Sequence, residues 1–248
     1  MKLGAQLYTL RKQMTTPEEI EKGLEKVAKI GYSCIQASGI GKIEPQRLKD
    51  ICDRLGIEIA VTHTAPDSIL GDTENVIVDH TIMDCKYVGL GAMPKNYRKH
   101  ENIDDFYNNF HRAVDMITDS GKFFTYHNHA FEFEKRDGVF MLDKLFEKFD
   151  NIKLTLDCYW ANYGGVDVLE LIDKYKGKLD CVHLKDYAIV NNEIRMAPVM
   201  RGNMNYPKII EKLESAGTKY ALVEQDDCYG EDPFDCLEES FNNLKKYF

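Results

Sequence analysis

Four side chains in the second half of the sequence have the types and positions to hold a divalent cation. Asp157, His183 and Glu224 each close a short apolar run, and Glu132 lies just past another such run. Each residue alone has an ordinary explanation, such as a helix N-cap, a loop ion pair or a buried histidine. Their joint occurrence favours a metal site, because three carboxylates and one imidazole suit Mn²⁺, Mg²⁺, Co²⁺ or Zn²⁺. Without an ion, converging carboxylates would repel each other.

Such a site is expected to catalyse proton transfer on a sugar-like substrate. A bound cation polarises a carbonyl, which acidifies the neighbouring C–H bond. One of Glu132 and Glu224 then removes the proton and the other returns it, which gives isomerisation or epimerisation. The same intermediate can instead expel a leaving group. A metal-dependent dehydratase or lyase acting on a keto-sugar or an inositol derivative is therefore the alternative.

Further polar and aromatic side chains cluster at the ends of the apolar runs and are predicted to contact the substrate. Tyr8 and Trp160 offer aromatic faces for a sugar, although packing explains them equally well. His63 is either a substrate contact or a core residue, and His129 and Lys185 are candidates for orienting hydroxyls. The predicted substrate-binding residues are Tyr8, His63, His127, His129, Trp160, Lys185 and Arg201.

Eight strand-like runs alternate with helical patterns and must position these residues. The expected strands cover residues 3–8, 32–37, 57–63, 87–90, 123–128, 152–157, 179–184 and 220–224. Units of about thirty residues are typical of β-α-β crossovers. We therefore predict one (β/α)8 TIM barrel that spans residues 1–248 as a single domain. In such a barrel the C-terminal ends of the strands form the substrate-binding rim, where the candidate residues lie.

One long connection, residues 185–205, has no clear periodicity and is a candidate active-site flap. The first helix has clear boundaries: Thr16 can cap it, Pro17 can start it and Gly31 can end it.

Composition narrows the classes of partner. The formal net charge of −9 opposes nucleic-acid binding, which needs clustered basic residues. No apolar stretch reaches the roughly 18 residues of a membrane helix. Seven scattered Cys do not form a disulfide pattern, and there is no signal-peptide core, so we expect a cytoplasmic protein. A small carbohydrate is the expected partner, and the oligomeric state stays open, a homo-oligomer included.

Five motifs together resemble the xylose isomerase-like superfamily of sugar isomerases and epimerases. They are the runs 6–11 (QLYTLR), 126–133 (YHNHAFEF), 156–160 (LDCYW) with Gly164 and Gly165, 182–186 (VHLKD) and 223–226 (VEQD). The resemblance implies a (β/α)8 fold and a metal held by Glu132, Asp157, His183 and Glu224. The family's first ligand often lies inside the fifth strand at the position of His127, which makes His127 the alternative to Glu132.

The sequence departs from this family before the seventh helix. Relatives carry a Gly-acid-Gly run there, whereas this chain has Arg201 and Gly202. The change puts the family's usual substrate contact in doubt and favours an anionic substrate, for which Lys185 and Arg201 are the candidate partners.

Two further readings remain. An apurinic-site endonuclease has a related barrel, but Trp160 stands where its Asp-x-x-His motif needs a second ligand. A non-catalytic sugar-binding barrel does not require a proton-shuttling pair of acids. Enzymes that depend on a nucleotide cofactor or on a serine nucleophile are disfavoured, because the Gly-rich and nucleophile motifs are absent.

Overall fold

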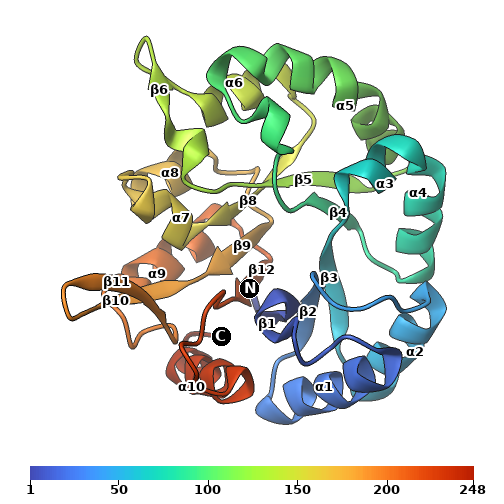
Figure 1. Cartoon of the computed structure of the whole chain (residues 1–248), viewed down its shortest axis with the longest axis vertical. Coiled ribbons are helices and arrows are strands. Elements are labelled where there is room, and N and C mark those ends of the chain that lie inside the picture. The colour runs from blue at the N-terminus through green and yellow to red at the C-terminus, as the bar shows by residue number, and fades with distance from the viewer.

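Eight parallel strands close into a barrel in the computed structural model, which describes residues 1–248 (Figure 1). Hydrogen-bonded neighbours follow the order β1-β12-β9-β8-β5-β4-β3-β2, which returns to β1. The strands are β1 (Lys2–Gln6), β2 (Cys34–Ala37), β3 (Glu58–His63), β4 (Tyr87–Leu90), β5 (Phe123–His127), β8 (Lys153–Asp157), β9 (Cys181–Leu184) and β12 (Tyr220–Val223). The predicted (β/α)8 fold is confirmed.

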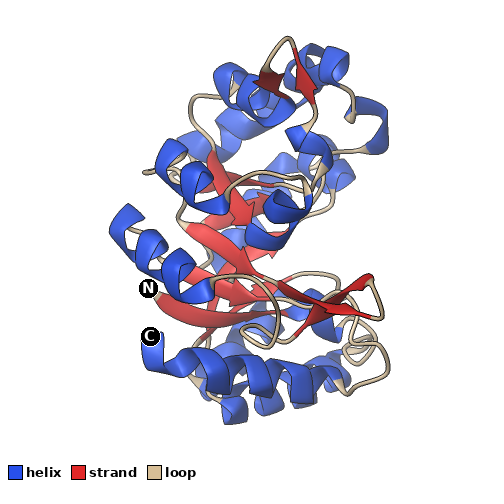
Figure 2. Ribbon diagram, turned by 90° about the vertical axis from the view of Figure 1, so that its left-hand side faces the viewer, coloured by secondary structure: helices blue, strands red, loops and turns tan.

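Helices follow the strands and form the outer layer of the molecule (Figures 1 and 2). They are α1 (Pro17–Ile30), α2 (Pro45–Leu55), α3 (Pro66–Gly71), α4 (Thr73–Ile82), α5 (Ile103–Asp119), α6 (Met141–Lys148), α7 (Cys158–Tyr163), α8 (Val168–Lys174), α9 (Tyr206–Ala216) and α10 (Pro233–Leu244). None of them combines the length and the apolar character that crossing a bilayer requires.

The first helix illustrates how local sequence sets the element boundaries. The Thr16 hydroxyl accepts from the backbone N–H of Glu19 at 3.3 Å, and the Glu19 carboxylate accepts from the Thr16 N–H at 3.1 Å. This reciprocal capping satisfies two backbone donors that the first turn leaves free. Gly31 ends the helix at a φ of 119°, in the left-handed region that favours glycine. The predicted boundaries of this helix are confirmed.

The core has two parts, one on each face of the strand layer. A cluster of 57 buried residues fills the space between the strands and the helices. Inside the barrel lies a separate cluster of six residues, Cys34, Ala60, Val61, Tyr87, Cys181 and Leu222. Because both faces of each strand are buried, the strands read as nearly continuous apolar runs.

The N-terminal ends of the strands are closed by polar contacts among large side chains. The Tyr87 hydroxyl donates to Asp180 at 2.7 Å, and Lys219 donates to the same carboxylate at 2.9 Å. Tyr220 and Lys2 both donate to Glu58. These contacts seal one rim, so that the opposite rim is left as the entrance to the barrel.

Two β-hairpins interrupt the strand-helix alternation. The candidate flap, expected as an irregular connection, contains β10 (Asp186–Val190) and β11 (Glu193–Ala197). Figure 2 shows this hairpin projecting on the side of the molecule away from the two chain termini. A smaller hairpin, β6 (Lys135–Arg136) and β7 (Val139–Phe140), lies between β5 and α6.

Candidate active site

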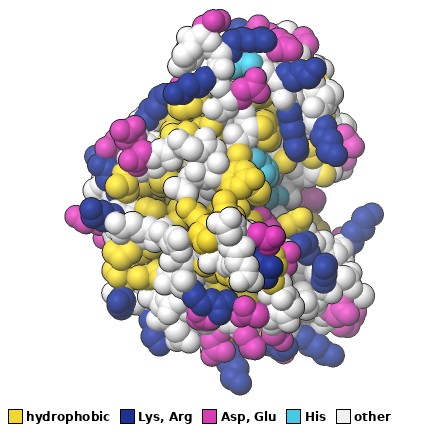
Figure 3. Space-filling view, turned by 60° about the vertical axis from the view of Figure 1, so that its left-hand side comes forward, with side chains coloured by type: hydrophobic (Ala, Val, Ile, Leu, Met, Phe, Trp, Pro, Cys, Tyr) yellow, Lys and Arg dark blue, Asp and Glu magenta, His cyan; other side chains and the backbone are white.

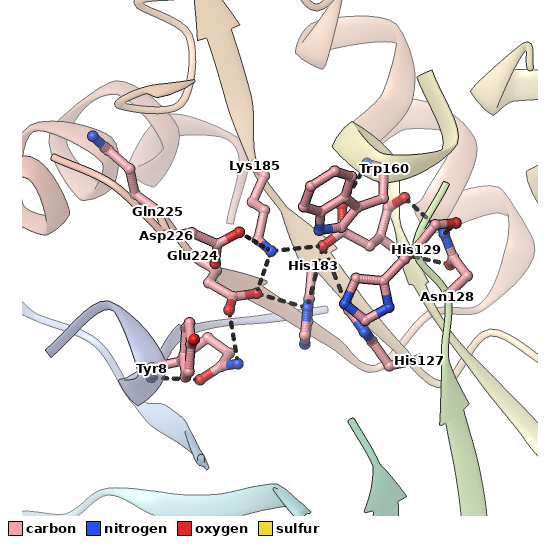
Figure 4. A network of polar contacts seen from close by, with 12 residues as sticks. Tyr8, His127, Asn128, His129, Trp160, His183, Lys185, Glu224, Gln225 and Asp226 are labelled. Carbon is pink, nitrogen blue, oxygen red and sulfur yellow. Dashed lines mark hydrogen bonds and ion pairs between the residues drawn. The ribbon is translucent and has the colours of Figure 1, made fainter. Parts of the chain in front are cut away.

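Four buried side chains from four neighbouring strands meet at the C-terminal end of the barrel. His127 ends β5, Asp157 ends β8, His183 lies in β9 and Glu224 follows β12. Asp157 and His183 are register partners, so their side chains leave the sheet on the same face. One ligand atom from each of the four residues lies within 4.8 Å of the others. Figure 4 shows His127, His183 and Glu224 converging from their strands.

Hydrogen bonds orient both imidazoles of this four-residue cluster. His127 Nδ1 lies 2.9 Å from the backbone carbonyl of Gly91, which only accepts, so this nitrogen carries the proton. In the neutral ring Nε2 is then a lone pair, and it lies 3.2 Å from Asp157 Oδ2. His183 Nε2 contacts Gln36 Oε1 at 2.6 Å in the same way. His183 Nδ1 lies 2.9 Å from Glu224 Oε2, and both atoms are buried.

A buried lysine neutralises the acids of the site. Lys185 Nζ lies 3.1 Å from Asp157 Oδ2, 3.0 Å from Glu224 Oε2 and 3.0 Å from Asp226 Oδ2 (Figure 4). Its side chain is 2% exposed. The first two of these oxygens are those that contact the cluster's imidazoles. Lys185 therefore supplies positive charge at the position where the carboxylates face one another.

The pKa values of the charged groups follow from this arrangement. Burial raises the pKa of Asp157 and of Glu224, but the Lys185 ammonium and the neighbouring imidazoles together outweigh burial and hold both pKa values below their usual range. Burial lowers the pKa of Lys185, but the charges of the three acids together outweigh burial and raise that pKa above its usual value. Burial and the Glu224 charge raise the pKa of Asp226 to about 7. Asp157 and Glu224 are thus anionic at neutral pH, beside a cationic lysine.

The structure does not bring Glu132 to the cluster, which corrects the position expected for it. Glu132 lies on a 3₁₀ turn after β5 and is fully buried. Its carboxylate accepts from the Tyr126 hydroxyl at 2.6 Å and from the backbone N–H of His129 at 2.8 Å. Burial raises its pKa to about 7. His127, the alternative first ligand, lies in the cluster instead.

A pocket of about 390 Å³ opens above the cluster. It is lined by six of the seven predicted substrate-binding residues: Tyr8, His63, His127, His129, Trp160 and Lys185. In Figure 3, histidine and acidic side chains lie along the hollow on this face of the molecule. Arg201 does not line the pocket. Its guanidinium pairs with Glu231 at 2.9 Å and with Glu239 at 3.3 Å, which corrects its expected place at the substrate.

Two of the lining histidines keep free ring nitrogens. His63 Nδ1 contacts the Ser38 hydroxyl at 3.0 Å, while its buried Nε2 has no partner. The His129 ring lies tilted beside Trp160, with ring centroids 5.6 Å apart, and its Nδ1 has no partner. Burial lowers the pKa of both, that of His129 to about 3, so both are neutral imidazoles. Neutral imidazoles can each donate and accept a hydrogen bond to a hydroxyl.

Sequence reasoning did not assign a site role to three residues that the structure places here. Gln6 Nε2 donates to Glu224 Oε1 at 3.0 Å, Gln36 accepts from His183, and Asp226 lines the pocket. Gln6 is the last residue of β1, and Gln36 is the residue before the end of β2. Strand alternation places both side chains on the inner face of the barrel. A buried amide on the inner face of a barrel strand is the signal that would have found both.

The sequence matches the family model described as xylose isomerase-like TIM barrel over residues 24–247. The chain belongs to this family. Among solved structures, this xylose isomerase-like barrel resembles a sugar phosphate isomerase/epimerase from Parabacteroides distasonis with a TM-score of 0.81 and 23% identity, over 98% of this chain and 93% of that one. No curated protein matches the chain by sequence.

Two more distant structures share the same xylose isomerase-like fold. An L-ribulose 3-epimerase has a TM-score of 0.74 at 14% identity, over 99% of this chain and 94% of that one. A probable 3-DHS dehydratase from Bacillus anthracis has a TM-score of 0.72 at 14% identity, over 99% of both chains. At these identities the comparisons establish the fold, and the chemistry must be argued from the site.

The four-residue cluster of this xylose isomerase-like barrel fits a divalent cation. The donor atoms are His127 Nε2, Asp157 Oδ2, His183 Nδ1 and Glu224 Oε2. Three of the six distances among them are 2.9, 3.2 and 3.6 Å, and all six are within 4.8 Å. Ligands at about 2.0–2.2 Å from one ion are separated by roughly 3–3.5 Å. Both imidazoles donate their other N–H to an oxygen acceptor, as metal-binding histidines do. The cluster therefore has the donors, the spacing and the outer hydrogen bonds of a metal centre.

Proposed function

We propose that this chain is a divalent-metal-dependent isomerase or epimerase of a small polyhydroxylated carbohydrate. His127, Asp157, His183 and Glu224 would hold the ion. The observation that carries the proposal is the convergence of two carboxylates and two imidazole lone pairs, with each imidazole oriented by an acceptor on its far side. Lys185 contacts only the two carboxylate oxygens of this cluster, whereas a divalent ion would bind the two imidazole nitrogens as well. A bound divalent ion polarises a carbonyl oxygen and stabilises the negative charge that develops on it.

Glu224 is the group assigned to move the proton. It belongs to the cluster through Oε2 and also lines the pocket. Its Oε1 accepts from Gln6 Nε2 at 3.0 Å, and Gln6 is itself fixed because its Oε1 accepts from the Tyr8 N–H at 2.7 Å. This chain of contacts holds the carboxylate in one orientation beside the substrate, which a general base requires.

The remaining pocket residues bind and orient hydroxyl groups. Lys185 Nζ lies 3.0 Å from the Glu224 carboxylate and can donate to an oxygen that gains negative charge. The free nitrogens of His63 and His129 offer hydrogen bonds from two sides of the pocket. Trp160 and Tyr8 offer aromatic faces to the C–H surface of a sugar ring. Glu132 has no part in proton transfer in this assignment, because its carboxylate is enclosed behind the strand.

A dehydratase or lyase acting on a keto-sugar is the second candidate, and one observation favours it. Glu224 is the single glutamate at the pocket, and its nearest cationic neighbour is Lys185. One base beside one cationic proton donor is the pair that removes a proton and assists a departing hydroxyl. Epimerisation, in contrast, needs proton donors on both faces of the reacting carbon.

Solvent-deuterium incorporation tests the proposal directly. The purified protein, loaded with Mn²⁺, is incubated in D₂O with a panel of ketoses, and proton exchange and products are followed by NMR. We expect metal-dependent exchange that Glu224→Gln lowers by about 10²–10⁴-fold. Glu193→Gln, an exposed residue on the β10–β11 hairpin, is the matched control and should leave exchange unchanged. A Glu224→Gln protein with full exchange and full metal content would refute the proposal, and loss of water from the product would select the dehydratase.

A further inference from the structure

The loops that commonly bind phosphate in TIM barrels are occupied here by the protein's own acids. In this fold the phosphate site frequently lies at the loops after the seventh and eighth strands, where backbone N–H groups point at the anion. The corresponding strands are β9 and β12. We infer that the pocket takes an uncharged, unphosphorylated polyol or keto-sugar and rejects the phosphorylated form. The inference rests on the proposed function and narrows its substrate class.

Backbone N–H groups of the loop after β9 already donate to the carboxylate of Asp186. This carboxylate accepts from the N–H groups of Tyr187 at 2.8 Å, Met200 at 2.9 Å, Met204 at 3.1 Å and Gly202 at 3.2 Å. Asp186 is buried. A ring of converging backbone N–H groups is the arrangement that binds anions in proteins. Here the anion is a side chain of the same loop, so these donors are not available to a ligand.

At Gly202 the backbone of the loop lies directly against the Asp186 carboxylate. A Cβ at this position would lie 2.3 Å from Asp186 Oδ1 and 2.4 Å from the Tyr187 carbonyl. The glycine lets the backbone approach the carboxylate at a distance that no other residue permits. The loop is therefore built around Asp186.

The loop after β12 is acidic and caps its own helix. Asp232 is the N-cap residue of α10 and accepts from the N–H of Phe234 at 2.8 Å. Asp227 accepts from the N–H of Tyr229 at 2.8 Å. Asp226 lies in the pocket itself. A phosphate placed here would meet carboxylates rather than free N–H groups.

Three cationic side chains in or near the pocket already have partners within the protein. Lys185 contacts three carboxylates, and Arg201 contacts Glu231 and Glu239 outside the pocket. Arg11 donates to the backbone carbonyls of Tyr8 and Asp226, each at 2.8 Å. A phosphate monoester carries a charge of about −1.5 to −2 at neutral pH. Like-charge contacts of this kind weaken binding by roughly two orders of magnitude.

The lining that remains suits neutral hydroxyl groups. Ser38, His63 and His129 can donate or accept, and Trp160 supplies an aromatic face. This combination matches a polyol ring with one polar edge and one C–H face. It also reverses the expectation of an anionic substrate that Arg201 raised.

The test compares matched pairs of substrates on the metal-loaded protein. The pairs are D-fructose with D-fructose 6-phosphate and D-ribulose with D-ribulose 5-phosphate, and the readout is the kcat/KM of deuterium exchange in D₂O. We expect the free sugars to exchange at least about 100-fold more efficiently than their phosphates. Equal or faster exchange of the phosphates would overturn the inference and leave the proposed function intact. No exchange in either pair, with metal bound, would overturn both.

A charge variant tests the physical reason. Asp226→Asn removes the acid from the pocket and leaves Lys185 with one carboxylate fewer, so the preference for the free sugar should shrink by about tenfold or more. Asp119→Asn, on an exposed residue that ends α5, is the matched control and should keep the preference. Equal preferences in the two variants would overturn the role given to Asp226.

Discussion

Replacing Lys185 with Met should destabilise the metal-free protein strongly. Lys185 Nζ contacts the carboxylates of Asp157, Glu224 and Asp226 at 3.1, 3.0 and 3.0 Å, and its own side chain is 2% exposed. Removing one partner of a buried ion pair costs about 3–5 kcal/mol, because the other partner is left as an unpaired buried charge. In a protein of this size each kcal/mol lowers Tm by roughly 2–4 °C. The expected loss in Tm is therefore about 6–20 °C in the presence of a chelator.

A bound metal should offset much of this loss. Lys185 contacts Asp157 Oδ2 and Glu224 Oε2, which are also the oxygens assigned to the ion. Without the lysine, the ion becomes the principal counter-charge, so Mn²⁺ should raise Tm more in Lys185→Met than in the wild type. Saturation at about 1,000 times Kd adds about 4 kcal/mol to any protein that binds only when folded.

Thermal unfolding followed by circular dichroism, with EDTA and with Mn²⁺, measures both effects. The control is Lys148→Met at the end of α6, where the lysine side chain is 42% exposed and pairs at 2.7 Å with Asp104, which is 53% exposed. An exposed pair is worth about 0–1 kcal/mol, so this variant should lose little and gain from Mn²⁺ as much as the wild type does. An Mn²⁺ increment in Lys185→Met that is no larger than in the wild type would refute the reasoning.

Three further predictions follow from individual contacts. The pKa of Glu132 is about 7 in the folded protein and 4.5 as its ordinary value, so the folded state binds a proton more tightly than the unfolded state. The free energy of unfolding should therefore fall as pH rises from 4.5 to 7. Glu132→Gln should remove this pH dependence, as measured by urea unfolding. Two imidazoles in the ligand set should make calorimetric Kd values lower for Mn²⁺, Co²⁺ and Zn²⁺ than for Mg²⁺; tightest binding of Mg²⁺ would contradict it. Gly202→Ala should lower Tm, since its Cβ would lie 2.3 Å from Asp186 Oδ1; an unchanged Tm would show that the loop relaxes freely.

Local patterns were sufficient to predict the barrel and the rim that carries the site. Eight apolar runs, each followed by a helical pattern, leave a closed parallel barrel as the natural architecture, and the structure confirms it. Polar residues at the ends of such runs must lie at one rim, because parallel strands share their direction. Asp157, His183 and Glu224 therefore converge as expected.

The fourth member of the cluster shows what local patterns leave open. Glu132 lies beyond the end of its strand, and only the 3₁₀ turn at Phe131–Phe133 decides where it points. That turn sends it to Tyr126, whose side chain lies on the outer face of β5 against Phe106. His127 directly follows Tyr126 in β5, so its side chain lies on the inner face. Strand alternation alone distinguishes the two faces and favours His127.

The β10–β11 hairpin has a recognisable turn signal in its sequence. Asn191 and Asn192 join its strands with φ values of 51° and 65°, the left-handed pair that a two-residue hairpin turn requires. Asp137 and Gly138 do the same for the β6–β7 hairpin. The pairing of Arg201 with Glu231 and Glu239 had no such signal. It depends on how the loop before α9 packs against α10, which is a tertiary contact.

The central claim is that one divalent cation binds among His127, Asp157, His183 and Glu224. Anomalous diffraction at the manganese edge, from crystals grown with Mn²⁺, locates such an ion without reference to activity. The account predicts a single strong peak within about 2.3 Å of His127 Nε2, Asp157 Oδ2, His183 Nδ1 and Glu224 Oε2. A peak coordinated by Glu132 without His127, or no peak among these four side chains, would contradict it.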